Sequence, residues 1–249
     1  MSERIRLDLA MEQRGLVPSR ARARDAILRG TVTLNGVTPV KQNQMVGKDD
    51  VVALSDPAAN YVSRAALKLV AGLDAGAIDP KDKACADIGA STGGFTQVLM
   101  ERGARRIYAV DVGHGQLHER LKGSDRVVSM EGVNAKDLNA EMIAEPIDLL
   151  VSDVSFVSVT KVLAGPLALC APGADAVILF KPQFEVGRRN VGKGGIVRSE
   201  EAIATALTEM IAFMQAEGFA HRLSIPSPIT GGDGNTETVA IFRKNAVLS

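Results

Sequence analysis

The stretch Lys83-Ala-Cys-Ala-Asp-Ile-Gly-Ala-Ser-Thr-Gly-Gly-Phe95 decides the fold of this chain. Its first part, Ala84 to Ile88, is a short apolar run that predicts a buried strand. Glycines follow, and then a helical pattern places Phe95, Val98 and Leu99 on one face. A strand, a glycine turn and a helix form the first unit of a nucleotide-binding α/β sheet.

The loop and the next strand narrow the choice of nucleotide. A predicted strand from Arg106 to Val110 leads into Asp111, 22 residues after Gly89, where a carboxylate can accept hydrogen bonds from ribose hydroxyls. The loop Gly89–Gly94 lacks both the G-x-G-x-x-G spacing of dinucleotide sites and the Gly-Lys-Ser/Thr of phosphate loops. A cofactor with an adenosine but no phosphates relaxes both demands, so we expect S-adenosylmethionine. The alternative is an ordinary glycine turn.

The rest of the C-terminal part repeats the strand–helix pattern, and alternation of this kind predicts a doubly wound, mostly parallel α/β sheet. The last two strands and their glycine-rich connection predict an antiparallel edge hairpin. A helix is expected from Arg64, capped by Ser63, to Leu73. The other expected strands are Val127–Met130, Ile147–Val151, Ala174–Phe180, Ala220–Ile225 and Thr238–Phe242, with a helix at Glu200–Glu217.

Composition sets wider limits. The 249 residues are 46% hydrophobic and carry a formal net charge of +0, so whole-chain charge gives no argument for nucleic-acid binding. Both cysteines, Cys85 and Cys170, lie in apolar runs, and the low cysteine content is typical of a reducing cytosol. No signal-type apolar region and no 18-residue apolar run occurs, so we expect a cytoplasmic protein without a membrane partner.

Residues 1–57 are expected to form a separate small α+β domain, followed by a linker at 58–62 and a second domain at 63–249. One helix carries Ile5, Leu9, Ala10 and Leu16, and a second, capped by Ser19, runs from Arg20 to Leu28. Around Asn35-Gly36 we expect a hairpin of Thr31–Leu34 with Val37–Val40, before a strand at Val51–Leu54.

This first domain is locally basic. Its first 55 residues hold nine Arg and Lys against six Asp and Glu, and Arg20, Arg22 and Arg24 are clustered. Such a run is either a solvated helix face or a surface that contacts RNA phosphates. The segments Arg6-Leu-Asp-Leu, Arg14-Gly-Leu, Ser19-Arg20, Gly30-Thr-Val, Asn35-Gly36 and Asp50-Val-Val resemble the S4-type RNA-binding module, which favours the RNA surface.

Ionisable residues end or begin several strands of the second domain. Lys181 follows Ala176–Phe180, and an ammonium beside five apolar residues is costly unless it is paired or used. Asp153 follows another strand, and Glu237 opens the last one. With Lys68 in the expected helix they form a Lys-Asp-Lys-Glu set in chain order.

That set resembles the FtsJ/RrmJ-type ribose 2′-O-methyltransferases, and longer motifs resemble the TlyA family, a group of ribosomal RNA 2′-O-methyltransferases historically labelled haemolysins. The motifs are Val62-Ser-Arg-Ala-Ala-Leu-Lys68, Gly89-Ala-Ser-Thr-Gly-Gly-Phe95, Asp111-Val-Gly-His-Gly-Gln-Leu117, Asp153-Val-Ser-Phe156, Lys181-Pro-Gln-Phe-Glu-Val-Gly187 and Gly234-Asn-Thr-Glu237.

The resemblance implies a Rossmann-like methyltransferase fold, a cytidine target in ribosomal RNA and catalytic roles for Lys68, Asp153, Lys181 and Glu237. It favours 23S RNA of the 50S subunit over 16S RNA, and we expect a monomer that needs no metal. The cofactor is expected at Asp87, Gly89, Ala90, Ser91, Thr92, Gly93, Gly94, Phe95, Asp111, Val112 and Asn134. RNA contacts are expected from Arg4, Arg6, Arg20, Arg22, Arg24, Arg64 and Phe156.

The chemistry of these residues supports the assignment. A ribose hydroxyl is a poor nucleophile near neutral pH, and a lysine can lower its pKa or accept its proton. We assign that role to Lys181, held by Asp153, with Lys68 and Glu237 orienting the hydroxyl. Phe156 either stacks on the target base or packs in the core.

Several sequence features leave alternatives open. Asn190–Gly195 resembles a phosphate loop but follows no strand, so a lid or RNA-contact loop is expected. His114 and His118 have a metal-compatible spacing but no evident third ligand. The competing functions are a dehydrogenase that uses Asp111, a cytolysin, and a ribosome-assembly factor that binds RNA without methylating it.

Overall fold

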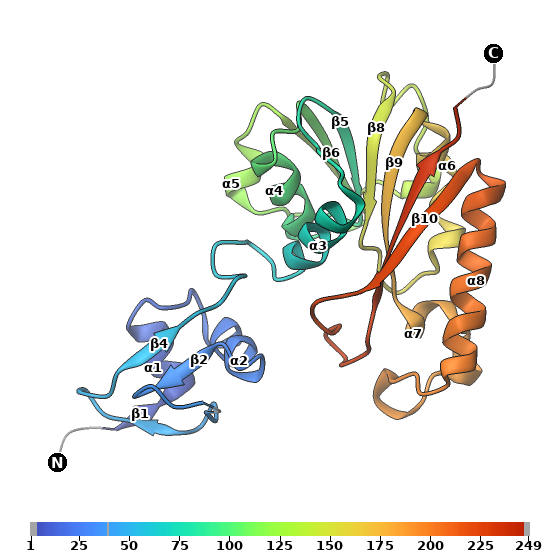
Figure 1. Ribbon diagram of the computed structural model, residues 1–249. Helices are drawn as coiled ribbons and strands as arrows, with labels where there is room; N and C mark the ends of the chain where they lie inside the picture. The colour runs from blue at the N-terminus through green and yellow to red at the C-terminus, as the bar shows by residue number, and fades with distance from the viewer. Residues whose placement is uncertain (1–3, 39, 247–249) are drawn as a thin grey trace. The chain divides into compact units, whose positions relative to one another are not determined.

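A computed structural model describes residues 4–38 and 40–246. The chain divides between Asn60 and Tyr61 into two compact units, and the linker expected at 58–62 contains this division. Figure 1 draws the first unit in blue and the second from teal to red.

The first unit packs two short helices against two small antiparallel sheets. Strand β1 pairs with β3, and β2 pairs with β4. Its buried core comes from both helices, from β2 and β3, and from Val40. The elements are β1 (Ile5–Arg6), α1 (Leu7–Gln13), α2 (Arg20–Leu28), β2 (Val32–Leu34), β3 (Met45–Val46) and β4 (Val52–Leu54).

The second helix of this unit is confirmed, whereas the first differs in phase. Ser19 caps α2 by accepting a hydrogen bond from the Arg22 amide. In α1, Leu7 and Met11 are fully buried, whereas Leu9 is only half-buried. The prediction therefore chose the wrong buried face of this helix: Leu7 and Met11, four residues apart, lie on the same side and form it.

The predicted hairpin at Asn35-Gly36 is wrong in its second strand. The turn forms, but only Leu34 and Val37 are bridged, and no strand occurs at 37–40 among the described residues, which exclude 39. The partner of β2 is β4 instead. Asn35 directs this pairing: its amide donates to the Val51 carbonyl at 2.8 Å, and its side-chain oxygen accepts from the Val51 amide at 2.8 Å.

The second unit is built on a seven-stranded sheet in the order β10-β11-β9-β8-β5-β6-β7. Strands β9, β8, β5, β6 and β7 are parallel, and β11 runs antiparallel between β9 and β10. The strands are β5 (Ala84–Ile88), β6 (Arg106–Asp111), β7 (Val127–Glu131), β8 (Ile147–Ser152), β9 (Cys170–Phe180), β10 (Phe219–Pro226) and β11 (Thr238–Lys244). Each strand predicted for this domain is present, and the predicted antiparallel edge hairpin is confirmed.

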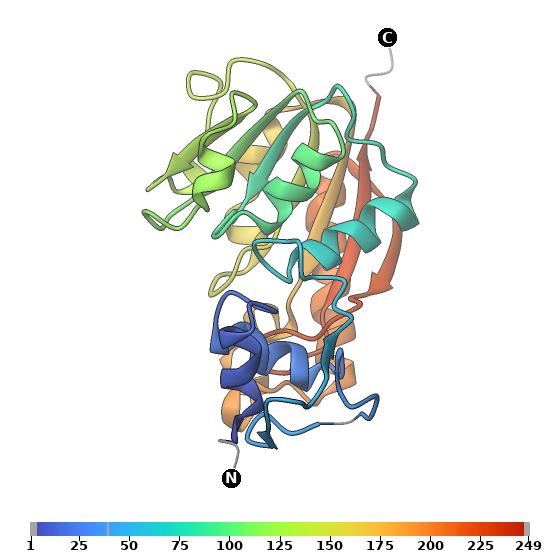
Figure 2. The same ribbon diagram turned by 90° about the vertical axis from the view of Figure 1, so that its left-hand side faces the viewer.

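Helices cover both faces of this sheet (Figures 1 and 2). Alternate residues of β8 separate the two cores: Leu149 faces the side of α3 and α4, and Leu150 faces the side of α6 and α8. The strands are apolar on both faces, as a covered parallel sheet requires. The helices are α3 (Ala66–Gly76), α4 (Gly94–Glu101), α5 (Glu119–Lys122), α6 (Ala164–Ala168), α7 (Pro182–Glu185) and α8 (Glu200–Ala216).

Helix α3 lies unusually close to the sheet. A Cβ atom added at Gly72 would lie 2.8 Å from a methyl carbon of both Val177 in β9 and Val239 in β11. The helix begins at Ala66, three residues after the expected cap Ser63, whose hydroxyl accepts from the Ala65 amide in the preceding turn. The missing side chain at position 72 therefore sets the depth at which α3 docks.

We predict that Gly72→Ala destabilises the second unit. Alanine improves helix propensity by about 1 kcal/mol, but overpacking a rigid core costs about 1–3 kcal/mol, so we expect a net loss of about 1 kcal/mol. Urea unfolding followed by circular dichroism measures it. The matched control is Gly232→Ala, where nothing lies within 4 Å. Equal stability of both variants would contradict close docking of α3.

Candidate active site

The carboxyl ends of parallel strands β5, β6 and β8 border one open cleft. Its volume is about 370 Å³, within the usual range for small-molecule sites. A smaller recess of about 140 Å³ shares four of its residues and also reaches Lys181 at the end of β9. The shared residues are Gly89, Ser91, Asp153 and Ser155.

Most of the residues expected to hold the cofactor line these two hollows. The cleft is lined by Gly89, Ser91, Asp111, Val112 and Asn134, and the recess by Gly89, Ala90, Ser91, Thr92, Gly94 and Phe95. Sequence reasoning did not assign several other cleft residues to the site. Four of them lie within motifs that carry the family resemblance, namely Gly113, Gln116, Val154 and Ser155, and the others are Val133, Ala135, Val157 and Val162.

Two of the expected cofactor residues, Asp87 and Gly93, line neither hollow. Asp87 is completely buried, and its carboxylate accepts a hydrogen bond from the Thr96 hydroxyl at 2.6 Å. Burial raises the pKa of this carboxyl to about 7. Asp87 therefore fastens the start of α4 to β5 from beneath the cleft. Gly93 leaves room for Leu117 and Leu121, which a Cβ atom there would overlap.

The glycine loop is shaped by close backbone contacts. Gly89 has φ +85°, and a Cβ atom there would lie 3.0 Å from the Val154 amide nitrogen. A side chain would therefore push the loop after β5 away from the loop after β8, which carries Asp153. Glycine is required here for both its conformation and its size.

Asp111 is held in place by the loop it supports. Its two oxygens accept hydrogen bonds from the Ser91 amide at 2.8 Å and the Gly113 amide at 2.7 Å. Glu131, opposite Asp111 on β7, accepts from the amides of Gln116 and Leu117. These amide donors lower the pKa of Glu131 to about 2. Two carboxylates at neighbouring strand ends thus fix the far wall of the cleft.

Lys181 ends β9 in a buried position with three oxygen atoms around its ammonium. Its Nζ lies 2.6 Å from Asp153 Oδ1, donates to the Ser155 hydroxyl at 2.6 Å and donates to the Asp153 carbonyl at 3.2 Å. The predicted pairing with Asp153 is present. Ser155 was not predicted, although it lies two residues beyond Asp153 in the same motif.

Lys68 and Glu237 form a second buried ion pair. The Lys68 ammonium donates to Glu237 Oε2 at 2.5 Å, with side chains 8% and 2% exposed. Lys68 lies one helical turn before Gly72, so the close docking of α3 carries the lysine into the protein. A Cβ atom at Gly231 would lie 2.6 Å from Glu237 Oε1, so this glycine leaves space for the carboxylate.

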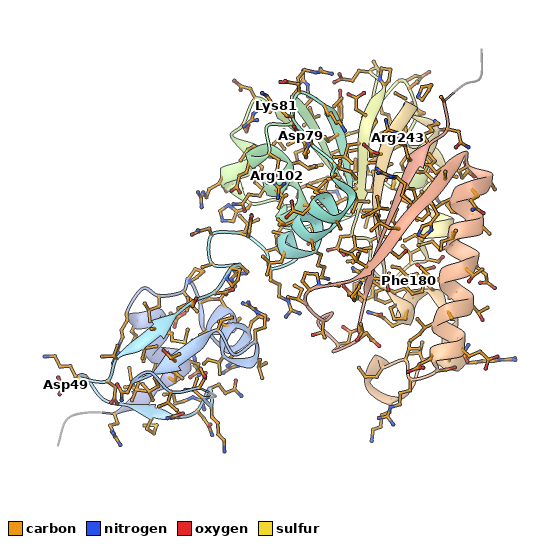
Figure 3. The ribbon with its side chains drawn as sticks, in the orientation of Figure 1. Asp49, Asp79, Lys81, Arg102, Phe180 and Arg243 are labelled. Atoms are coloured by element: carbon orange, nitrogen blue, oxygen red, sulfur yellow. The ribbon has the colours of Figure 1, made fainter. Side chains whose placement is uncertain are left out.

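The strand register places the two ion pairs next to each other. Phe180, labelled in Figure 3, pairs with Thr238 across β9 and β11. The adjoining positions, Lys181 and Glu237, therefore end up on neighbouring strands at the same edge of the sheet. Asp153 lies on the other side of Lys181, after β8. The sheet thus gathers the Lys-Asp-Lys-Glu set at one edge, where Asp153 and Lys181 line the recess and Lys68 and Glu237 line neither hollow.

The loop expected as a lid or RNA contact is tied to this edge. Asn235 is 3% exposed; its side-chain oxygen accepts from the Val197 amide at 3.0 Å, and its nitrogen donates to the Gly195 carbonyl at 2.9 Å. The segment Asn190–Gly195 consists of short turns rather than a phosphate-binding loop before a long helix. Asn235, two residues before Glu237, therefore ties the end of this segment to the start of β11.

Phe156 lies at the mouth of the cleft. Its side chain is 91% exposed, and its ring lies 5.3 Å from that of Phe184. Its φ of +67° is unusual for a bulky residue, a strain that occurs mostly at functional sites. The core-packing alternative for Phe156 is wrong.

The arginines expected to bind RNA do not form the cluster that the sequence indicated. Arg20 and Arg24 both bind Asp8, and Arg6 joins them. Arg22 instead donates to the Ala58 carbonyl at 2.9 Å. Residues two apart on a helix point in different directions, whereas residues four apart share a face. In the same unit Arg4 lies 4.0 Å from Asp50, and in the second unit Arg64 precedes α3.

Two further expectations concern metals and membranes. His118 caps α5, where its Nδ1 accepts from the Arg120 amide, and His114 lies in the preceding loop. Within residues 4–38 and 40–246, no group of three His, Cys, Asp or Glu side chains is arranged to hold a metal ion. No helix in the described part of the chain is long and apolar enough to span a membrane.

Comparisons with known proteins extend over both units. The FtsJ-like methyltransferase family model matches residues 61–244, and the S4 domain model matches residues 5–52. The 16S/23S rRNA (cytidine-2′-O)-methyltransferase TlyA of Mycobacterium tuberculosis is 41% identical over 241 residues, which cover 95% of this chain and 89% of that protein. The 23S rRNA (cytidine-2′-O)-methyltransferase TlyA of Campylobacter jejuni is 38% identical over 188 residues, 74% of this chain and 72% of that protein.

A solved structure supports the same grouping. A haemolysin-named protein from Streptococcus thermophilus superposes with a TM-score of 0.76 at 35% identity, covering 98% of this chain and 90% of that one. The two domain models match adjacent parts of the chain, and the M. tuberculosis relative matches across both. The chain therefore belongs to the TlyA family of FtsJ-like methyltransferases, with an S4 domain before the methyltransferase domain.

Proposed function

We propose that this protein uses S-adenosylmethionine to methylate the 2′-hydroxyl of a cytidine ribose in ribosomal RNA. The observation that carries the proposal is the pair of buried lysine–carboxylate contacts beside the cleft. Both TlyA relatives are named for 23S RNA, and one also for 16S RNA. We take 23S RNA of the large subunit as the target. We expect the protein to act on it as a monomer in the cytoplasm.

The cleft suits S-adenosylmethionine. Each oxygen of Asp111 accepts one backbone N–H, and a carboxylate oxygen can accept another, so Asp111 retains capacity for ribose hydroxyls. Apolar walls from Val110, Val112 and Val133 suit an adenine ring. Bound S-adenosylmethionine supplies an electrophilic methyl group. Asp153, on the border of cleft and recess, offers a negative charge to a cationic cofactor.

Lys181 provides the charge that the ribose hydroxyl needs. Asp153 Oδ1, the Asp153 carbonyl and the Ser155 hydroxyl match the three N–H groups of an ammonium. Beside the ribose 2′-oxygen, this ammonium stabilises the alkoxide that develops when the hydroxyl reacts. Ser155 keeps its own O–H proton and can pass a hydrogen bond on to the substrate.

The remaining residues position the nucleotide. Lys68 and Glu237 place a buried ion pair beside Lys181, and Gly231 packs closely against the Glu237 carboxylate. Phe156 offers an exposed aromatic face for the target base, which must leave its stack to reach the recess. A ribosome-assembly factor without activity would need neither buried ion pair.

We predict that Asp111→Ala weakens S-adenosylmethionine binding by about 10- to 100-fold, because it removes a charged acceptor that also shapes the loop. Titration calorimetry with the cofactor and its demethylated product measures the loss. Asp125→Ala, at an exposed aspartate outside the cleft, is the matched control and should bind normally. Binding of NADH in place of S-adenosylmethionine by the wild-type protein would overturn the cofactor assignment.

We predict that Lys181→Ala lowers the single-turnover rate of methyl transfer by about 10²-fold or more, as for other well-placed acid–base groups. Cofactor affinity should remain near the wild-type value, because Asp111 and its loop are untouched. Radiolabelled methyl transfer to 23S RNA reports the rate, and calorimetry reports the affinity.

The control for this change is Lys161→Ala, which removes an exposed lysine. A 23S RNA carrying 2′-deoxycytidine at the target position should accept no methyl group from either protein. Lys181→Ala retaining most of the wild-type rate would remove Lys181 from the chemistry.

A further inference from the structure

Three arginines of the first unit meet on one buried carboxylate. Asp8 is completely buried, whereas the side chains of Arg6, Arg20 and Arg24 are 41–47% exposed. Arg6 binds both Asp8 oxygens, at 3.0 and 3.1 Å, and Arg20 and Arg24 bind Oδ2 at 3.2 and 3.1 Å. We call these four residues the arginine cluster.

The local sequence explains why the cluster forms. Asp8 lies in the first turn of α1, where its Oδ1 also accepts from the Leu9 amide at 3.0 Å. Arg20 and Arg24 are four residues apart on α2, which packs against α1, so both reach the same point. Five donors thus surround one carboxylate and hold its pKa well below the usual range.

The cluster carries an excess of positive charge toward solvent. One carboxylate cannot neutralise three guanidinium groups, and each guanidinium has five N–H donors. Asp8 uses two from Arg6 and one each from Arg20 and Arg24. Planar donor forks of this kind match the oxygens of a phosphate group.

We propose that Asp8 is a positioning residue for RNA, which holds Arg6, Arg20 and Arg24 together as a preformed site for backbone phosphates. The inference rests on the proposed ribosomal RNA substrate. Free arginine side chains lose rotamer freedom when they bind a phosphate, and Asp8 removes that freedom before RNA arrives. Arg22, which binds the Ala58 carbonyl, lies outside the cluster.

The substitution Asp8→Asn separates this role from simple electrostatics. It removes a negative charge, so bulk charge alone predicts tighter binding to RNA. A positioning role predicts the opposite, because asparagine keeps only one acceptor oxygen and its NH2 group cannot accept from a guanidinium, so contacts that hold the arginines are lost. The matched control is Asp49→Asn, the same charge change at an exposed residue of the same unit that points away from it (Figure 3).

The experiment is filter binding of full-length protein to 23S RNA over a series of salt concentrations. We expect Asp8→Asn to weaken binding about tenfold, and Asp49→Asn to leave it unchanged or slightly tighter. Hydrogen exchange of the α1 and α2 amides checks that the first unit stays folded. A folded Asp8→Asn that binds as tightly as Asp49→Asn would overturn the inference.

If Asp8→Asn unfolds the first unit, the variants Arg24→Lys and Arg6→Lys test the positioning role instead. Lysine keeps the charge but cannot bind Asp8 and a phosphate through one planar fork, so both variants should bind RNA more weakly at every salt concentration. Wild-type affinity in both would refute the positioning role. A wild-type protein that neither binds nor methylates 23S RNA would instead refute the proposed function, which keeps the two failures distinct.

Discussion

The second unit depends on the burial of two lysine ammonium groups at one edge of its sheet. An unpaired buried charge is strongly unfavourable, so each lysine must keep its carboxylate partner within hydrogen-bond distance. For Lys181 the partners come from the loop after β8, and for Lys68 the partner opens β11. This requirement links α3, β8, β9 and β11, and it explains why glycines occur where these elements approach each other most closely.

In the first unit the buried charge is a carboxylate, and the charges around it are cationic. Asp8 lies beneath the arginines, and the excess positive charge faces outward. In the second unit each buried lysine is instead paired with one carboxylate, and one of these pairs, Lys181 with Asp153, lines a small recess. One arrangement suits phosphates along an extended backbone, and the other suits a single reacting hydroxyl. On the proposed function, the first unit would supply RNA binding and the second unit the chemistry.

The sequence predicted the fold well because apolar runs, glycine turns and caps are local signals. The strands of the large sheet and helices α2 and α8 are where those signals placed them. Asp153 and Lys181 were also predicted from strand ends, since parallel strands bring their carboxyl ends to one edge, whereas Lys68 and Glu237 joined them only through the family resemblance. Other features depend on contacts that no local pattern records. The pairing of β2 with β4, the depth of Lys68 and the direction of Arg22 are set by residues distant in the chain.

The proposed function is tested most directly by the position at which the methyl group is added. Purified 50S and 30S subunits lacking the modification can be incubated with the protein and S-adenosylmethionine, and their RNA mapped by mass spectrometry at nucleotide resolution. We predict a single new 2′-O-methylcytidine in 23S RNA and none in 16S RNA. A methyl group on a base, on 16S RNA alone, or on neither RNA would contradict it.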